Sequence, residues 1–449
     1  MKEHQVTSLP VSKGVTLANL LTQKINLLDI LETAASQGDI VRVLMMRQSA
    51  YFLNTPDAIK HVLVDNHRNY HKGRGLQAAR GLIGNGLLTS EDDLHTRQRR
   101  MIQPSFHRRR IATYADVMTA HTQAQIATWR AGDQPDLHEE LMTLTMGIVA
   151  QCLFDVDVRH DAPELSAALE GVFDNLSMLD SSPLGQLLTK LPLPRTQRRR
   201  DHMSVLDAAI HEFIEQRRNN PAERDDLLSM LLLARDEEGD HMGMSDQQVR
   251  DEVMTLFLAG HETTANALSW AFYLLTQNPS VETKLVEELT RVLGDRPPTM
   301  NDLAALPYNK MVLSEAMRLY PPAYVMGRQA LADDEIAGHV IPAGATVLMS
   351  QYTMHRHPRY WDDPLQFMPE RFDKDSPAHS QRPRYAYFPF GGGARMCIGE
   401  PFAWMEGELL LATILQRYHF TLQAGAVIEP EPLITLRLKH GLPVTIHPR

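Results

Sequence analysis

The sequence is poor in cysteine, with two among its 449 residues, Cys152 and Cys397. So low a count excludes a disulfide-stapled secreted scaffold and fits a reducing compartment. Long apolar runs are missing too: none approaches the roughly 18 residues of a membrane span, and the start at Lys2, Glu3 and His4 lacks the form of a secretory signal. We therefore expect a soluble, cytoplasmic protein, with Cys152 packed in its core.

Linkers and repeats are also absent from the sequence. Because no glycine- or proline-rich linker, low-complexity tract or internal repeat divides it, we predict one domain over residues 1–449. Hydrophobic residues make up 43% of the chain, enough for a large core, and the net charge of -10 argues against general nucleic-acid binding. The basic residues form two clusters: Arg97, Arg99, Arg100, Arg108, Arg109 and Arg110, and Arg195, Arg198, Arg199 and Arg200. We expect the second to be a solvated helix end, with a membrane-surface or partner contact as the alternative.

The most informative stretch is residues 390–399, Phe-Gly-Gly-Gly-Ala-Arg-Met-Cys-Ile-Gly. Its glycines allow close approach to a flat ligand. Apolar residues at helical spacing over 400–418 place Cys397 just before a helix, whose dipole, with the cation of Arg395, favours the thiolate. One thiolate is too few for a zinc or iron–sulfur site, whereas haem iron needs one axial protein donor. The alternative is a small buried cysteine in a turn.

The same ten residues match the pattern Phe-Gly-x-Gly-x-Arg-x-Cys-x-Gly. The matching positions are Phe390, Gly391, Gly393, Arg395, Cys397 and Gly399. The chain thereby resembles the cytochrome P-450 family of haem-thiolate monooxygenases, of the soluble bacterial type. The resemblance implies a mainly α fold with a small β region, a long central helix over haem b, and Cys397 as the axial ligand of the iron.

A second stretch lies in the middle of a predicted helix over 245–278, which Pro279 stops. Its centre, Ala-Gly-His-Glu-Thr-Thr over 259–264, is polar where a core is expected. Threonine hydroxyls there can bond the carbonyl four residues back. A hydroxyl with a carboxylate behind it can relay protons to oxygen in a dry pocket. A zinc-protease reading fails because residue 265 is alanine.

The resemblance gives these residues roles in oxygen chemistry. It implies that Thr263 holds the bound oxygen species and that Glu262 passes protons to it. Ala259 and Gly260 would leave room over the haem face.

Three basic residues are candidates for the haem carboxylates. His95 and Arg99 lie at i and i+4 on a helix predicted to run to about Ser105, where two donors on one face suit a carboxylate; a solvated basic face is the alternative. The resemblance implies that both, together with Arg328, bind haem propionates. The resemblance also implies that this helix lies on the Cys397 side of the haem, where an acidic redox partner would dock.

A further motif is predicted to be structural. Glu315 and Arg318 lie at i and i+3 on a helix and can pair. The resemblance joins them with Arg371 in a buried network behind the cysteine loop.

Substrate contacts are predicted in two segments. Residues 72–90 are loop-like yet carry Leu82 and Leu87, which favours a lid or ligand-facing loop, or equally a loop folded on the core. After Pro322, strands are predicted over 324–331, 335–341 and 346–350. The resemblance implies that the substrate is approached by four residues, with a core strand as the alternative: Ala323, Tyr324, Val325 and Met326.

We therefore predict a monooxygenase that inserts one oxygen atom from O2 into a C–H bond (hydroxylation) or C=C bond of a small apolar substrate. Since no iron–sulfur or flavin segment is present, electrons would come from NAD(P)H through a reductase and a ferredoxin, or a flavodoxin. The protein is expected to be monomeric. The alternatives are a peroxide-driven peroxygenase and a non-catalytic haem sensor, and the Glu262–Thr263 pair argues against both.

Overall fold

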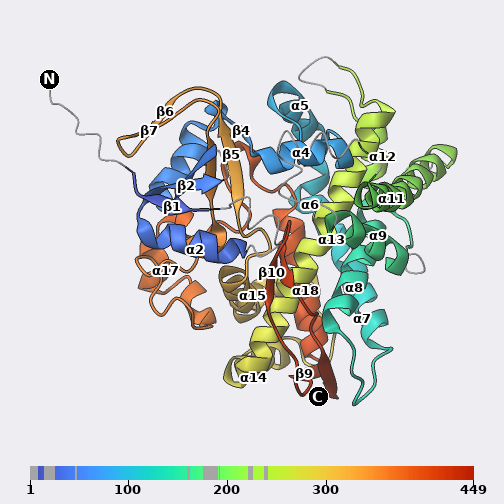
Figure 1. Ribbon diagram of the computed structural model, residues 1–449. Coiled ribbons are helices and arrows are strands. Elements are labelled where there is room, and N and C mark those ends of the chain that lie inside the picture. The colour runs from blue at the N-terminus through green and yellow to red at the C-terminus, as the bar shows by residue number, and fades with distance from the viewer. Residues whose placement is uncertain are drawn as a thin grey trace.

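The computed structural model describes residues 9–14, 26–45, 48–158, 162–174, 191, 193–220, 226–236 and 241–449. Figure 1 shows the largest sheet on one side and most helices on the other, with α13 (Asp246–Gln277) running through the helical part beside α18 (Glu400–Leu415). The predicted mainly α fold with a small β region is confirmed.

The largest sheet has six strands in the order β1-β2-β3-β8-β5-β4. Within it β1 pairs parallel with β2 and β3 with β8, while the other neighbours are antiparallel. Its strands are β1 (Val11–Lys13), β2 (Ile40–Met45), β3 (Gln48–Leu53), β4 (Tyr70–Lys72), β5 (Met326–Ala330) and β8 (Thr346–Met349). Three two-stranded pairs complete the β structure: β6 (Asp334–Ile336) with β7 (His339–Ile341), β9 (Tyr418–Leu422) with β12 (Val444–Pro448), and β10 (Pro430–Pro432) with β11 (Leu436–Leu438).

Sixteen α-helices lie in the described part of the chain. Those before α13 are α2 (Leu27–Gln37), α3 (Pro56–Lys60), α4 (Arg74–Ile83), α5 (Asp92–Ile102), α6 (Arg108–Ile111), α7 (Ala115–Ile126), α8 (Leu137–Phe154), α9 (Ala162–Asp174), α11 (Pro194–Asn219) and α12 (Leu227–Leu233). Between α13 and α18 lie α14 (Pro279–Leu293), α15 (Pro307–Leu319), α16 (Gln351–Met354) and α17 (Pro377–Gln381).

The central helix α13 begins and ends where the sequence predicts. Ser245 caps it through a capping box with Gln248, and it ends at Gln277, just before Pro279. Its 32 residues span about 48 Å, and the helix is continuous through its polar centre. It can therefore carry side chains from the molecular surface to the interior.

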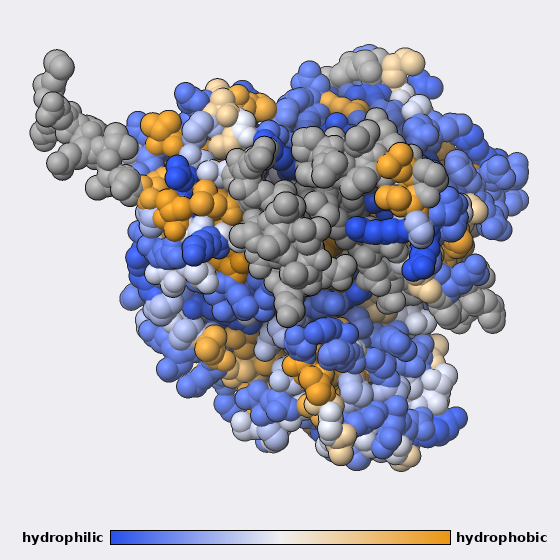
Figure 2. Space-filling model, viewed as in Figure 1, coloured by the Kyte–Doolittle hydropathy of each residue, from blue (hydrophilic) through white to orange (hydrophobic). Residues whose placement is uncertain are grey.

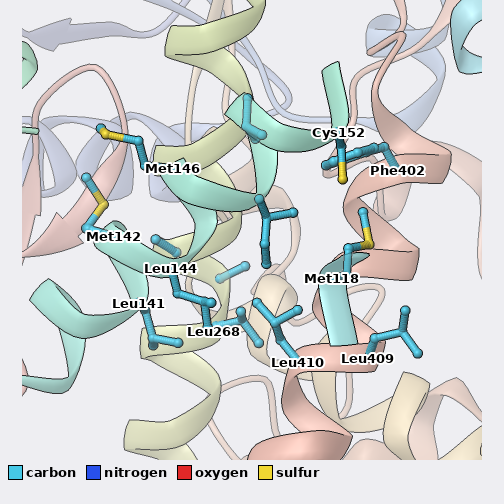
Figure 3. Packing of buried hydrophobic residues seen from close by; sticks show 14 of the residues in the cluster. Met118, Leu141, Met142, Leu144, Met146, Cys152, Leu268, Phe402, Leu409 and Leu410 are labelled. Atoms are coloured by element: carbon cyan, nitrogen blue, oxygen red, sulfur yellow. The ribbon is translucent and has the colours of Figure 1, made fainter. Parts of the chain in front are cut away.

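The main core surrounds α13. Figure 3 shows apolar residues of α7, α8, α13 and α18 converging, with Cys152, Met118, Leu268 and Phe402 among them. Cys152 is 2% exposed, so the prediction that it packs in the core is confirmed. This packing fixes α18, and with it the loop that carries Cys397, against α13.

Two predicted elements differ from those observed. Residues 72–90, predicted to be a loop, contain α4, because Leu76, Ala79 and Ile83 form one apolar helix face despite the glycines between them. Residues 335–341, predicted to be one strand, lie in a hairpin, because Gly338 adopts a positive φ of 79° at the turn between β6 and β7.

The surface is mixed in polarity. On the face in Figure 2, hydrophilic residues predominate and hydrophobic ones form small scattered groups. None of the helices within the described ranges has the length and apolarity required to cross a bilayer. The basic cluster on α11 is not wholly solvated as predicted, because Arg199 is buried at 7% exposure.

Candidate active site

Cys397 and the centre of α13 line one cavity. Its volume is about 1480 Å³, and it also receives residues from α4, α5, β5 and the turn between β10 and β11. Cys397 is exposed to this interior space. Because ordinary small-molecule pockets measure about 300–1,000 Å³, the cavity can hold a large group and a second molecule.

The loop before Cys397 is held by its own backbone. The Cys397 N–H donates to the Phe390 carbonyl at 3.0 Å, and the Gly391 N–H donates to the Phe388 carbonyl at 2.9 Å. Gly393 has a φ of 68°, and a Cβ there would lie 1.8 Å from the carbonyl oxygen of Leu63. Glycine is thus required by the close approach of another chain segment as well as by the turn.

The electrostatics of Cys397 differ in one respect from expectation. Burial raises the pKa of its thiol, while the backbone N–H groups of Gly399 and Glu400 and the cation of Arg99 lower it. The helix start acts in the predicted direction, but desolvation outweighs it. Arg395, the cation expected to act on Cys397, pairs with Glu91 at 2.5 Å, and Arg99 donates from Nη1 to the carbonyl of Met396, next to Cys397, at 2.8 Å.

Basic side chains gather at the same cavity, among them Lys72, His95, Arg99, Arg328 and Arg395. Burial and the neighbouring positive charges lower the pKa of His95 to about 3 and that of Arg328 to about 10. Burial also lowers the pKa of Lys72 to about 7, although Glu91 acts in the opposite direction. The positive charges of these side chains repel one another in a poorly solvated site. An anion bound in the cavity would therefore be stabilised by them.

These residues fit a haem. The thiol, the glycine-bearing loop and the basic cluster supply one iron donor, room for a flat group and partners for its carboxylates. The polar atoms of Lys72 show how such cations are held, since its Nζ donates to the carbonyls of Leu87 and Ser90 at 2.8 and 2.5 Å. The described residues contain no cluster of three or more His, Cys, Asp or Glu side chains suited to a metal ion.

The centre of α13 presents hydroxyl and carboxyl groups to the cavity. Thr263 donates from Oγ1 to the Ala259 carbonyl at 2.9 Å, the back-bond predicted for a threonine in this helix. Glu262 is 7% exposed, and its Oε1 accepts from the hydroxyl of Thr435 at 2.5 Å. Glu262, Thr263, Ala259 and Gly260 all line the cavity.

Gly260 has a packing role in addition to the predicted one. A Cβ at Gly260 would lie 2.9 Å from Cγ2 of Val149 on α8. The missing side chain therefore lets α8 pack closely against α13, while the residue also lines the cavity.

The structure brings together Glu315, Arg318 and Arg371. Arg318 donates from Nε and Nη2 to the two oxygens of Glu315 at 2.6 and 2.8 Å, and Arg371 Nε lies 3.4 Å from Glu315 Oε1. Arg318 also donates to the carbonyl of His355, whose Nε2 accepts from the N–H of Phe388. The network thus connects to the start of the cysteine loop.

The predicted substrate residues divide into three groups. Those that line the cavity are Leu87, Ala323, Val325 and Met326. Tyr324 does not line it: its ring is 2% exposed in a core cluster, because its hydroxyl donates to the Leu433 carbonyl at 2.7 Å and turns the side chain inward. The side chain of Leu82 lies outside the described residues.

Three residues of the site were missed from the sequence: Lys72, Asn266 and Thr435. Lys72 directly precedes a glycine in a segment predicted to be a loop, and its burial carries no local signal. Asn266 lies one helical turn after Glu262, and this i, i+4 spacing could have indicated that the two side chains share one face of the helix. Thr435 is far away in sequence, and nothing in its surroundings indicates its partner.

Two arginines near the expected docking side are engaged within the chain. Arg97 donates from Nη2 to the carbonyls of Met242 and Gly243 at 2.9 and 3.0 Å. Arg100 forms an ion pair with Asp236 at 2.8 Å. These cations join α5 to Asp236, Met242 and Gly243 and are therefore not wholly available to a partner.

A single thiol opening into a cavity ringed by basic side chains, below a helix that presents a carboxyl–threonine pair, defines the class of haem-thiolate oxidoreductases. A family model described as Cytochrome P450 matches residues 15–441, and the chain belongs to this family. It is accordingly a monooxygenase with haem as cofactor, acting with O2 on apolar substrates and depending on a redox partner.

Curated relatives match over most of their length. Cyclooctatin synthase of Streptomyces melanosporofaciens is 38% identical over 412 residues, 91% of this chain and 89% of the relative. Pentalenene oxygenase of Streptomyces avermitilis is 35% identical, covering 91% of this chain and 90% of the relative. Cyclooctat-9-en-7-ol 5-monooxygenase of Streptomyces melanosporofaciens is 36% identical, covering 89% and 86%.

Proposed function

We propose that the protein hydroxylates a bulky cyclic terpenoid in the cavity beside Cys397. The observation that carries the proposal is that one cavity of about 1480 Å³ contains both Cys397 and an apolar region bounded by Leu87, Val325 and Ile434. Two relatives have names that refer to oxidation of pentalenene and of cyclooctat-9-en-7-ol, and both names describe ring compounds. A rigid apolar ring system gains from burial without losing much rotational freedom.

The haem would be held by Cys397 at the iron and by the basic cluster at its carboxylates. His95, Arg99 and Arg328 would bind the propionates, and Lys72 adds a buried cation beside them. When bound, this cofactor supplies the oxygen-activating chemistry, and a thiolate ligand favours cleavage of the O–O bond. The polypeptide supplies the binding, orientation and proton supply.

Protons would reach the reacting oxygen through α13. The Thr263 hydroxyl faces the cavity and accepts or donates a hydrogen bond there, while the Glu262 carboxyl behind it gains and loses a proton. Leu87, Val325 and Ile434 line this region with apolar surface, so protons would pass through the Thr263 and Glu262 side chains rather than through bulk solvent.

Electrons would come from NAD(P)H through a reductase and a ferredoxin, or a flavodoxin. Arg99 of α5 contacts the backbone beside Cys397. An acidic electron-transfer partner that docks on the outer face of α5 would therefore lie close to Cys397. As part of the same proposal, the chain acts as one monomeric domain in the cytoplasm. Its two cysteines are unpaired, as a reducing compartment requires.

The first test concerns the iron ligand. Purified protein is reduced and exposed to carbon monoxide, and its absorption is compared with that of Cys397→Ser and the control Cys152→Ala. We expect the thiolate-type band in the wild type and the control and its loss in Cys397→Ser. A band of the histidine-bound type in the wild type would contradict the proposal.

The second test concerns the reaction. Sesquiterpene and diterpene hydrocarbons are screened for displacement of the haem-bound water, and bound compounds are incubated with O2 and a ferredoxin–reductase pair. We expect a product that carries one oxygen atom from ¹⁸O2. Turnover with hydrogen peroxide as fast as with the electron-transfer chain would favour a peroxygenase instead.

A further inference from the structure

The turn between β10 and β11 reaches the centre of α13. Its Thr435 side chain is 6% exposed and lines the cavity together with Ile434. The Thr435 hydroxyl donates to Oε1 of Glu262 at 2.5 Å and accepts from Nδ2 of Asn266 at 3.1 Å. Because Glu262 and Asn266 lie at i and i+4 on one helix face, this single hydroxyl bridges two successive turns of α13.

The turn itself is held in place on both sides. The Tyr324 hydroxyl donates to the Leu433 carbonyl at 2.7 Å, and the Leu436 N–H donates to the Pro322 carbonyl at 2.9 Å. Trp270 of α13 donates from Nε1 to the Leu436 carbonyl at 3.0 Å. The position of the turn is therefore set by the segment before β5 and by α13, the two elements that also border the cavity.

A fixed hydroxyl affects a carboxyl group in two ways. It restricts the side chain to the rotamer that makes the hydrogen bond, and it stabilises the ionised form, because a donor favours the carboxylate over the acid. Asn266 completes the arrangement, because its amide occupies the hydroxyl oxygen and leaves the hydroxyl proton for Glu262.

We infer that Thr435, oriented by Asn266, is a positioning residue for the Glu262 carboxylate and thereby sets how efficiently protons are delivered. The inference rests on the relay role proposed for Glu262. It adds that the contact comes from a turn whose neighbouring residue, Ile434, lines the cavity. A substrate that contacts Ile434 would therefore also contact the turn that orients the Glu262 carboxyl group.

The test compares Thr435→Val, which keeps the shape and removes the hydroxyl, with Thr435→Ser, which keeps the hydroxyl. We expect the ratio of product formed to peroxide released to fall about tenfold in Thr435→Val, short of the roughly 10²–10⁴-fold worth of a complete general acid. Thr435→Ser should stay within about twofold of the wild type by the same reasoning. Asn266→Ala should lie between the two.

A second readout does not depend on turnover. The carboxyl band of Glu262 in the infrared spectrum, identified by its loss in Glu262→Gln, is followed against pH. Since the Thr435 hydroxyl favours the carboxylate, its removal should raise the pKa of Glu262, and serine should restore it.

The outcomes separate the inference from the proposed function. If Thr435→Val leaves the product ratio and the carboxyl titration unchanged while Glu262→Gln lowers the ratio, the positioning role is wrong and the relay stands. If Glu262→Gln and Thr263→Ala also leave the ratio unchanged, the relay itself is wrong. A change in substrate affinity alone would mean that Thr435 only shapes the cavity, which also overturns the inference.

Discussion

Glu315 and Glu262 are both buried carboxyl groups, and they lie in different parts of the structure. Glu315 is fully buried and accepts two hydrogen bonds from Arg318 and one from the N–H of Met368, with Arg371 at 3.4 Å. Glu262 accepts a hydrogen bond from the hydroxyl of Thr435. Glu315 belongs to the network that connects, through Arg318 and His355, to the start of the cysteine loop, whereas Glu262 lines the cavity.

The difference separates a structural carboxylate from a chemical one. Two guanidinium groups, those of Arg318 and Arg371, pair with the Glu315 carboxylate inside the protein, as suits a structural role. Glu262 lines the cavity next to Thr263, where the proposed relay requires a carboxyl group that exchanges protons. Substitution of Glu315 should therefore mainly lower stability, whereas the same substitution of Glu262 should mainly lower turnover.

The largest expected effect on stability is that of Glu315→Gln. Because it leaves Arg318 and Arg371 without their counter-charge in the interior, it should lower the free energy of unfolding by about 3–5 kcal/mol. Urea denaturation followed by tryptophan fluorescence measures this. The control is Glu335→Gln at an exposed position, with an expected change within about 0.5 kcal/mol. A loss below 1 kcal/mol at Glu315 would contradict the structural role.

Glu262→Gln should show the reverse pattern. We expect the free energy of unfolding to change by about 1 kcal/mol, because glutamine still accepts from Thr435. The ratio of product to peroxide should fall at least tenfold, since the amide cannot pass a proton, within the roughly 10²–10⁴-fold range of general acids. Oxygen, NAD(P)H and peroxide are measured together. Equal ratios in variant and wild type would remove the contrast with Glu315.

Glu406 extends the comparison to a third carboxyl group, on α18. It is fully buried, and burial raises its pKa from 4.5 to about 8, although the Thr264 hydroxyl opposes this. Between those pH values the folded protein holds a proton that the unfolded chain has released. Its contribution to stability is therefore greatest at low pH and is lost as pH rises, by up to about 1.4 kcal/mol per pH unit.

Glu406→Gln should remove this dependence of the free energy of unfolding on pH. The free energies of unfolding of the variant and the wild type should be closest near pH 5. From there up to pH 8 the variant should become progressively more stable than the wild type, as measured by urea denaturation at each pH. Glu335→Gln serves again as the exposed control. A constant difference across this range would mean that Glu406 does not titrate there.

The smallest effect is expected for Tyr324→Phe. It removes the hydrogen bond to the Leu433 carbonyl and should lower the free energy of unfolding by about 1 kcal/mol. The product ratio should fall less than in Thr435→Val, because the turn keeps its bonds to Pro322 and Trp270. A larger fall than in Thr435→Val would make Tyr324 the main support of the turn.

Local patterns predicted much of the fold correctly, and most of the candidate site residues that they indicated line one cavity. The capping box at Ser245, the proline after α13 and the glycines around Cys397 act through neighbours in sequence, so the helix ends and the loop could be recognised directly. The segment 72–90 was misjudged, because its glycines suggested a loop while an apolar helix face, bordering the cavity, stabilises α4.

The sequence by itself determined the cofactor class and the reaction class, because one cysteine in a glycine loop and one acid–hydroxyl pair in a helix are local patterns with few uses. Only the tertiary structure decided that Arg99 reaches the backbone beside Cys397, that Tyr324 turns away from the cavity, and that Thr435 reaches Glu262. Each of these contacts joins residues far apart in the chain, and their distances depend on how the whole core packs.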